Sequence, residues 1–223
     1  MKQQSTLIHG KLYQDLTKRF IDIVLALIIL CIFILPACII ALLIKYSSEG
    51  PVFADVPERI GQNGTKFRMY KFRSMIQNAH QILRSDPKLK DLYKQYKKGS
   101  YKLLNDPRIT PVGRFIRKHS LDELPQILNV LKGDMSLVGP RAYYPDELEN
   151  QQREFPQAKK LVTNVLAAKP GITGLWQVSG RSKINFDERI VIDSRYVDTM
   201  SLVGDFVIIL KTPLIMLTGR GAV

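Results

Sequence analysis

IVLALIILCIFILPACIIALLI spans residues 23–44 and sets the architecture expected of this chain. The stretch holds 22 uncharged, almost wholly apolar residues. That exceeds the roughly 18 consecutive apolar residues that indicate a transmembrane helix. It is also too long for a signal peptide, and no small-residue cleavage site follows it. The sequence therefore predicts a helix embedded in a membrane.

Basic residues flank this apolar stretch on both sides. Most of the formal net charge of +13 lies beyond residue 45, and residues 1–20 are also basic. Within residues 1–20, Lys2, Lys11, Lys18 and Arg19 stand against one acid, Asp15. Basic flanks favour the cytoplasmic side, so a spanning helix would leave one flank on the unfavoured side.

Pro36 lies past the middle of the stretch. Proline cannot donate a backbone hydrogen bond, so it tends to kink or break a helix. A re-entrant helix that breaks at Pro36 and returns to the same face satisfies both the proline and the two basic flanks. A single-pass anchor that tolerates the proline is the alternative.

Composition points to anionic partners. The sequence pI of about 9.8 is typical of proteins that bind nucleic acid, an anionic membrane surface or phosphorylated small molecules. Both cysteines, Cys31 and Cys38, lie in the apolar stretch, where they read as small hydrophobic residues. No cysteine and histidine spacing typical of a metal site occurs, and nothing suggests a disulfide framework.

Beyond the apolar stretch, short predicted strands, turns and helices alternate. We therefore expect a membrane-associated α+β protein, with a membrane unit over residues 1–45 and a small catalytic domain over residues 46–223. Residues 52–53 and 67–72 are expected to pair as a hairpin around the turn GQNG at 61–64. A basic stripe along it could hold phosphates or lipid headgroups, or simply face solvent; its members are Arg59, Lys66, Arg68, Lys71 and Arg73.

Two further segments are candidates for interfacial helices. In residues 86–104, Leu89, Leu92, Tyr93 and Tyr96 recur at helical spacing among lysines. Such a helix can lie on an anionic membrane or pack on a protein core. Residues 205–217 are apolar but too short to span a bilayer, so the same two interpretations apply.

SLDELPQILNVLKGDMSLVGPR, residues 120–141, carries the candidate chemistry. Ser120 followed by Glu123 matches a capping box at a helix start. That box would place Pro125 at the fifth helical position, so we expect a kink there or a helix that starts nearer the proline. Gly133 is the expected helix end.

The two carboxylates, Asp122 and Glu123, then lie in the first turn of a helix, where the helix dipole stabilises anions. Arg114, Arg117, Lys118 and Arg141 supply cations nearby, and Mg²⁺ could join oxygen ligands. This combination suits phosphoryl transfer, which depends on positioning and charge neutralisation. An ionised aspartate can also attack phosphorus itself.

Several motifs in order resemble the bacterial sugar transferase family, the monotopic phosphoglycosyl transferases. They are KRFIDIVLAL, GPVF, KFRMYKFRSM, DPRITPVGRFIRKHSLDELPQILNVLKGDMSLVGPR and KPGITGLWQVSGRS. The resemblance implies transfer of a sugar-1-phosphate from a UDP-sugar to undecaprenyl phosphate, with release of UMP and use of Mg²⁺. It places the protein on the cytoplasmic face of the bacterial plasma membrane, in the first membrane step of exopolysaccharide or capsule synthesis.

The resemblance also implies residue roles. Asp122 would attack the sugar-bearing phosphate and hold the phospho-sugar, and Glu123 would help it bind Mg²⁺. Arg117 and Arg141 would bind phosphate. Asp193, and Arg181 of the GLWQVSGRS motif, would have supporting roles.

The sequence departs from the family pattern in places that bear on these roles. Leu35 precedes Pro36 where the family often has serine, and Ala142 follows Arg141 where a second proline is usual. The motif GLWQVSGRS resembles the form found in members that transfer hexose-1-phosphates, so glucose or galactose is favoured as the donor sugar. An N-acetylated or diamino sugar is the alternative.

Two other functions compete. A membrane-anchored binding protein would use the basic charge without chemistry, but the ordered DELPQ and GPR motifs do not favour it. A related enzyme could use Asp122 as a general base with no covalent step. The expected partners are a UDP-sugar, undecaprenyl phosphate and anionic membrane lipids, with no nucleic acid and a possible homo-oligomer.

Overall fold

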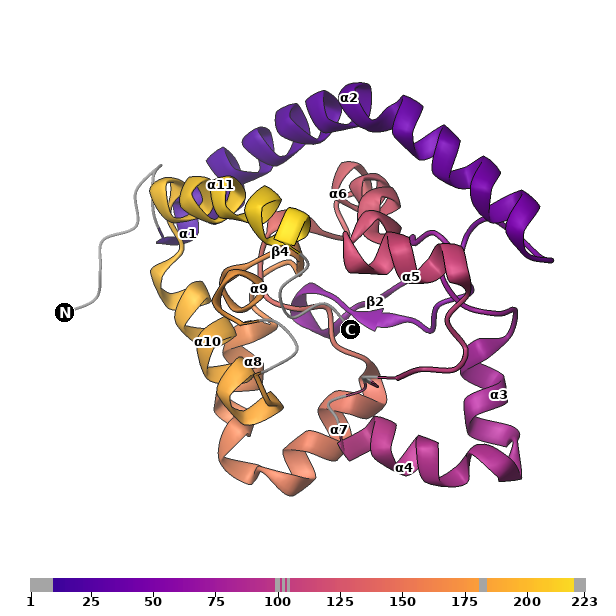
Figure 1. Cartoon of the computed structure of the whole chain (residues 1–223). Helices are drawn as coiled ribbons and strands as arrows, with labels where there is room; N and C mark the ends of the chain where they lie inside the picture. Colours follow the sequence, from indigo (N-terminus) through magenta and orange to yellow (C-terminus); the bar gives the residue numbers. More distant parts are fainter. Residues whose placement is uncertain (1–9, 99–100, 102, 104, 181–183, 219–223) are drawn as a thin grey trace.

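The long apolar helix α2 arches over the rest of the chain in the computed structural model (Figure 1). The structure describes residues 10–98, 101, 103, 105–180 and 184–218. Before α2 come α1 (Gly10–Leu12) and a π-helical turn, η1 (Tyr13–Thr17). Helix α2 itself runs over Lys18–Ser47. Together, residues 10–47 form a helical stretch long and apolar enough to cross a membrane.

The helix does not break at Pro36, which corrects that part of the prediction. Pro36 lies inside α2, and the helical conformation continues to Ser47. Proline removes only the hydrogen bond to the carbonyl four residues earlier, so the neighbouring turns can continue the helix while it bends. Figure 1 shows α2 curved over its whole length. The re-entrant path through a membrane stays a prediction.

The N-terminal end of α2 is bound to the globular part. Asp22 accepts a hydrogen bond from the Ser136 hydroxyl at 2.7 Å and from the Leu137 backbone N–H at 3.1 Å. Arg19 donates to the carbonyl oxygens of Val130 and Leu131 at 2.6 and 3.0 Å. The C-terminal end is bound as well, through Arg73, which donates to the carbonyl oxygen of Ser48 at 2.8 Å. Both ends of the apolar helix therefore attach to one body.

The globular part holds two small sheets among short helices. Strands β1 (Arg59–Ile60) and β2 (Lys66–Phe67) pair antiparallel, and β3 (Ser136–Val138) pairs parallel with β4 (Gly171–Thr173). The predicted hairpin is confirmed: a 3₁₀ turn, η2 (Gln62–Gly64), joins β1 to β2, and an isolated bridge links Phe53 to Phe72. The described part of the chain is mostly helical with few strands, which is compatible with the predicted α+β class.

The remaining helices surround these sheets. They are α3 (Ala79–Ser85), η3 (Pro87–Leu89), α4 (Lys90–Lys98), α5 (Pro111–Lys118), η4 (Leu121–Gln126), α6 (Ile127–Lys132), α7 (Pro145–Glu154), η5 (Pro156–Ala158), α8 (Lys159–Val165), α9 (Leu175–Ser179), α10 (Phe186–Thr199) and α11 (Leu202–Thr218). The largest buried cluster joins β3 to α2, α6, α10 and α11 through residues such as Ala26, Val130, Leu137, Tyr196 and Ile208.

The two candidate interfacial helices differ in what they bury. Helix α4 packs its aromatic side on a buried cluster that includes Tyr96 and Tyr144, so it is a surface helix on a core. Helix α11 buries Asp205 and Ile208 but leaves a row of large apolar side chains exposed, namely Val203, Phe206, Val207, Leu210, Leu214 and Leu217. Figure 1 shows α11 on the same side of the molecule as the start of α2. This side of the molecule therefore carries the exposed apolar side chains of α11.

Candidate active site

The acidic pair lies on a 3₁₀ segment rather than in a capped α-helix. Ser120 has a left-handed backbone (φ 55°) and makes no side-chain cap, so the predicted capping box is wrong. Glu123 instead donates its backbone N–H to the Ser120 carbonyl oxygen at 3.2 Å. The 3₁₀ turn η4 takes up Pro125, and α6 then follows and ends at Gly133 (φ 94°), as expected.

Lys71 binds the acidic pair from the other side of the site. Its ammonium lies 2.6 Å from Glu123 Oε1 and 3.9 Å from Asp122 Oδ2. Asp122 is buried, and this burial raises its pKa, as does the charge of Glu123. The charges of Lys71 and Arg117 lower the pKa of Asp122 and so favour its ionised form.

Arg117 comes from α5, which is fixed tightly beside the pair. Thr110 caps this helix by accepting the Gly113 backbone N–H at 2.9 Å. A β-carbon on Gly113 would lie 1.8 Å from the Ser74 carbonyl oxygen, so only glycine allows this approach. The close packing sets where Arg117, four residues later in α5, enters the site.

Arg141 follows β3 and is held by buried groups. Its backbone N–H donates to Asp193 Oδ2 at 3.1 Å, and the Tyr143 hydroxyl donates to the same oxygen at 2.8 Å. Its guanidinium lies over the Trp176 ring, 5.5 Å from the centroid. Burial raises the pKa of Asp193 to about 6, against the effect of these hydrogen bonds. Asp193 lies behind Arg141 and supports the loop rather than lining the cavity.

Two buried residues that the sequence did not single out complete this support. Arg189 donates to Glu147 Oε1 at 2.8 Å, and both side chains are fully buried. The same Glu147 oxygen lies 4.0 Å from Arg141 Nε. Glu147 therefore sits between two guanidinium groups. In the sequence, Glu147 stands six residues after Arg141. That spacing does not predict that Glu147 is buried or that it binds two arginines.

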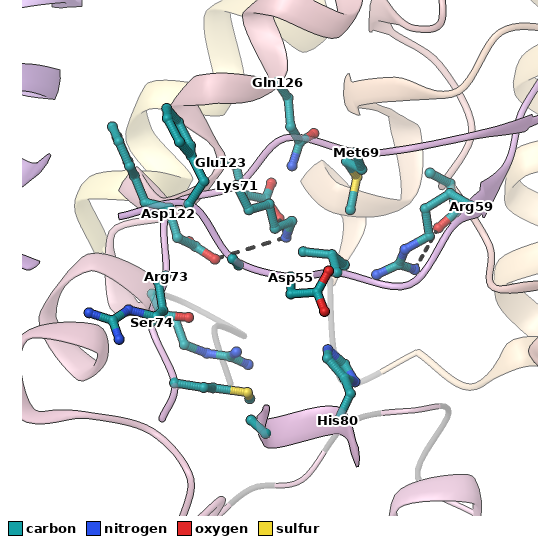
Figure 2. Close-up of a pocket in the computed structure, with 18 of the residues that line it drawn as sticks. Asp55, Arg59, Met69, Lys71, Arg73, Ser74, His80, Asp122, Glu123 and Gln126 are labelled. Carbon is teal, nitrogen blue, oxygen red and sulfur yellow. Dashed lines mark hydrogen bonds and ion pairs between the residues drawn. The ribbon is translucent and has the colours of Figure 1, made fainter. Parts of the chain in front are cut away.

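The acidic pair and the cations around it line one cavity of about 420 Å³. Its wall includes Lys71, Arg117, Asp122, Glu123 and Arg141, together with Arg59, Arg73, His80, Arg108 and Trp176. Figure 2 shows Asp122, Lys71 and Arg59 around the space, with His80 on the opposite side from Gln126. Burial, together with the charges of Arg108, Arg59 and Arg84, lowers the pKa of His80 to about 4, so it is neutral at pH 7. Of the predicted site residues, Arg181 lies outside the described part of the chain.

The side chains at the cavity suit a metal ion that is coordinated partly by the protein and partly by the substrate. Within the described residues, no group of three or more histidine, cysteine or acidic side chains could hold a metal ion. Asp122 and Glu123 nevertheless offer adjacent carboxylates at the cavity. Mg²⁺ is usually bound by one or two carboxylates plus substrate phosphates, so the acidic pair fits that mode.

Comparison with known proteins identifies the family. The bacterial sugar transferase profile matches residues 13–219, nearly the whole chain. The chain belongs to the bacterial sugar transferase family. The resemblance predicted from the motifs is therefore confirmed.

Named relatives cover this chain almost completely. An undecaprenyl-phosphate galactose phosphotransferase of Salmonella typhimurium is 45% identical over 209 residues, which are 92% of this chain and 41% of the relative. A UDP-glucose:undecaprenyl-phosphate glucose-1-phosphate transferase of Escherichia coli is 38% identical over 88% of this chain and 39% of its own length. The exopolysaccharide production protein ExoY of Rhizobium meliloti is 39% identical over 93% of this chain and 88% of its own length.

The chain thus spans less than half the length of several relatives, such as the Salmonella protein, and most of the length of ExoY. In this member of the family, one cavity is lined by the acidic pair, Arg117 and Arg141.

Proposed function

We propose that this sugar transferase moves a sugar-1-phosphate from a UDP-sugar to undecaprenyl phosphate and releases UMP. One observation carries the proposal: the acidic pair shares a cavity with Lys71, Arg117 and Arg141, in a chain that aligns with named undecaprenyl-phosphate sugar transferases. Two anionic substrates must react in turn at the same phosphorus, and the three cations supply the charge that lets each of them approach the acidic pair.

In the first half-reaction, a carboxylate oxygen of Asp122 attacks the phosphorus that bears the sugar. The bond from this phosphorus to the bridging oxygen breaks, and UMP leaves with the electron pair. Asp122 then holds the phospho-sugar as an acyl phosphate. In the second half-reaction, an oxygen of the lipid phosphate attacks the same phosphorus, and the Asp122 oxygen departs as a carboxylate.

The neighbouring residues have distinct parts in this scheme. Lys71 and Arg117 oppose the burial that raises the pKa of Asp122, and so favour its ionised form before attack. Arg117 and Arg141 bind phosphate oxygens through charge-assisted hydrogen bonds. Glu123, with Asp122 beside it, would hold Mg²⁺, which when bound supplies charge neutralisation on the diphosphate. Asp193 fixes the backbone of Arg141.

The donor sugar is proposed as glucose or galactose. The GLWQVSGRS version of its motif and the names of the Salmonella and Escherichia relatives both favour these hexoses. An N-acetylated or diamino sugar is the second candidate. Because ExoY is named for exopolysaccharide production, we propose that this protein takes part in making such a polymer or a capsule.

We also propose that the protein lies on the cytoplasmic face of the plasma membrane as a monotopic protein, bound to anionic lipids, and that it can form a homo-oligomer. The attachment of both ends of α2 to one body supports the monotopic arrangement. The exposed apolar row on α11 offers a second contact with lipid.

A screen of UMP release over a panel of UDP-sugars, with undecaprenyl phosphate and Mg²⁺, tests the reaction and the donor. Release with no sugar in the panel would contradict the proposal. The covalent step is tested separately, by mass spectrometry of the intact protein after incubation with donor alone. A gain of one phospho-sugar is expected; release of UMP only when acceptor is present, with no adduct, would favour Asp122 as a general base.

A further inference from the structure

Three consecutive residues, Lys71 to Arg73, contact two parts of the molecule that are distant in sequence, the acidic pair and the end of α2. Lys71 binds the carboxylates of the acidic pair. Phe72 binds the backbone of the same pair, and Arg73 binds the end of α2. This segment is therefore a direct connection between the apolar helix and the candidate nucleophile.

Arg73 closes the C-terminal end of α2. Its guanidinium donates to the carbonyl oxygens of Ser48 at 2.8 Å, Ile44 at 3.5 Å and Glu49. The last four carbonyls of a helix have no partner within it, so this end needs such a donor. Arg73 is only 5% exposed, so these bonds are shielded from water.

The turn after the helix is fitted to this guanidinium. Gly50 has φ +110°, a conformation that other residues rarely adopt. A β-carbon there would lie 2.5 Å from Arg73 Nη1. Arg73 also donates its own backbone N–H to the Val52 carbonyl oxygen at 2.8 Å. The chain that leaves α2 thus folds around Arg73 before it reaches the domain.

Phe72 joins the two ends of the connection. Its backbone N–H donates to the carbonyl oxygen of Asp122 at 2.9 Å. Its ring is buried with Ile40 and Ile44 of α2 and with Ile116 of α5. A shift of the helix end would therefore move both a backbone partner of Asp122 and the segment that carries Lys71.

We propose that Arg73 is a positioning residue that couples the end of the apolar helix to the geometry of the acidic pair. Its effect passes through Phe72 and Lys71. The consequence for turnover rests on the proposed function, whereas the geometric coupling does not. The experiment below therefore reads geometry and turnover separately.

The geometry is read by zero-length crosslinking. A water-soluble carbodiimide activates a carboxylate, which the Lys71 amine then attacks to form an amide, with loss of the activator as a urea. The 2.6 Å separation of Lys71 from Glu123 suits this bond. The yield of peptides that join Lys71 to the acidic pair is measured by mass spectrometry on the full chain in lipid nanodiscs.

The variants are Arg73→Gln, Arg73→Lys and, as a matched control, Arg68→Gln. Arg68 is an arginine five residues earlier whose side chain is exposed and paired only loosely with Asp55, at 3.3 Å. It lies outside the cavity wall. Arg73→Lys keeps the charge but lacks the planar fork that reaches several carbonyls. Circular dichroism and thermal unfolding verify that each variant is folded.

Arg73→Gln is expected to lower the crosslink yield severalfold and kcat by about tenfold to a hundredfold, since small misplacements of reacting groups have effects of this size. KM for the UDP-sugar should stay within about twofold, because the phosphate-binding arginines are unchanged. Arg73→Lys should be intermediate in both measurements, and Arg68→Gln should match the wild type. If Arg73→Gln does not fold, the proposal is tested with Arg73→Lys, by the same measurements of crosslink yield and kcat.

Unchanged crosslinking in a folded Arg73 variant overturns the coupling, whatever the turnover. A reduced crosslink yield in a protein that releases no UMP from any donor upholds the coupling and contradicts the proposed function instead. Reduced kcat with equal loss for Arg68→Gln would mean a general effect of removing positive charge, and would also overturn the proposal.

Discussion

Asp122→Asn is expected to abolish turnover and leave the fold intact. The amide has nearly the same shape but cannot act as an anionic nucleophile at phosphorus. The measurement is UMP release, with the intact mass of the protein after donor alone as a second reading. An Asp122→Asn protein that still turns over would contradict the assignment of Asp122.

Arg117 and Arg141 should matter for rate more than for stability. We expect alanine at either position to lower kcat/KM by at least a hundredfold, because a charge-assisted, bidentate contact to phosphate is lost. Lysine should restore only part of the activity, since it lacks the planar fork. Lysine variants with full activity would show that these arginines do not bind phosphate in this way.

Asp193 gives a prediction about pH. Its folded-state pKa of about 6 lies above the usual 3.8, so the folded protein holds this proton more tightly than the unfolded chain. The carboxyl group therefore favours the folded state at acid pH, and this advantage is lost as pH rises from 3.8 to about 6. The change amounts to about 3 kcal/mol.

Asp193→Asn removes this dependence. The free energy of unfolding of the wild type, relative to the variant, should fall between pH 4 and pH 7, as followed by denaturant titration in detergent. A difference that stays constant over this range would show that Asp193 is ionised in the folded protein throughout.

At the scale of residues, the order of the motifs was enough to predict that Asp122, Glu123, Arg117 and Arg141 lie at one site. All four line the same cavity. Sequence reasoning placed Lys71 only in a general basic stripe, because its partner Glu123 lies 52 residues away and the contact depends on the tertiary fold. Glu147 and Arg189 were missed for a similar reason. Their charges are informative only because both are buried, and burial at a single position is not visible in the sequence.

At the scale of elements, the close approach of α5 to the chain at Ser74 is testable. Gly113→Ala should lower the free energy of unfolding by about 1–3 kcal/mol, because the added methyl group meets a backbone carbonyl that cannot move freely. It should also reduce activity, since α5 carries Arg117. Thermal unfolding and UMP release are the two measurements.

Gly204→Ala in α11 is the matched control. A β-carbon there meets only the Ser201 hydroxyl, at 3.1 Å, and alanine favours a helix over glycine. This variant should be as stable as the wild type or more so. Equal destabilisation by both substitutions would mean that the backbone contact at Gly113 is not the cause.

Elements with strong local signals were predictable. The apolar run gave α2, the GQNG turn gave the hairpin, and Gly133 gave the end of α6. Local rules failed where two of them competed. Ser120 and Glu123 match a capping box, but Lys71 takes the Glu123 carboxylate and Ser120 adopts a left-handed turn. Pro36 signals a break, yet the flanking apolar turns continue the helix.

At the scale of the whole molecule, residues on either side of α2 are expected on the same, cytoplasmic face. Single cysteines replace the exposed Asp15 and Glu154, in a background without Cys31 and Cys38. Neither should react with an impermeant thiol reagent in intact bacterial cells, and both should react after permeabilisation. Labelling of the Asp15→Cys protein from outside would show that α2 spans the membrane.

The attachment of both ends of α2 to one body has a mechanical consequence. A spanning helix adjusts to a thicker or thinner bilayer by tilting, but a helix anchored twice cannot lengthen its path in this way. In the proposed monotopic arrangement, α2 would enter the membrane as an arch and would push lipids apart in the inner leaflet alone. The work of insertion then depends on lateral pressure in that leaflet, and strongly curved or loosely packed membranes should hold this protein most tightly.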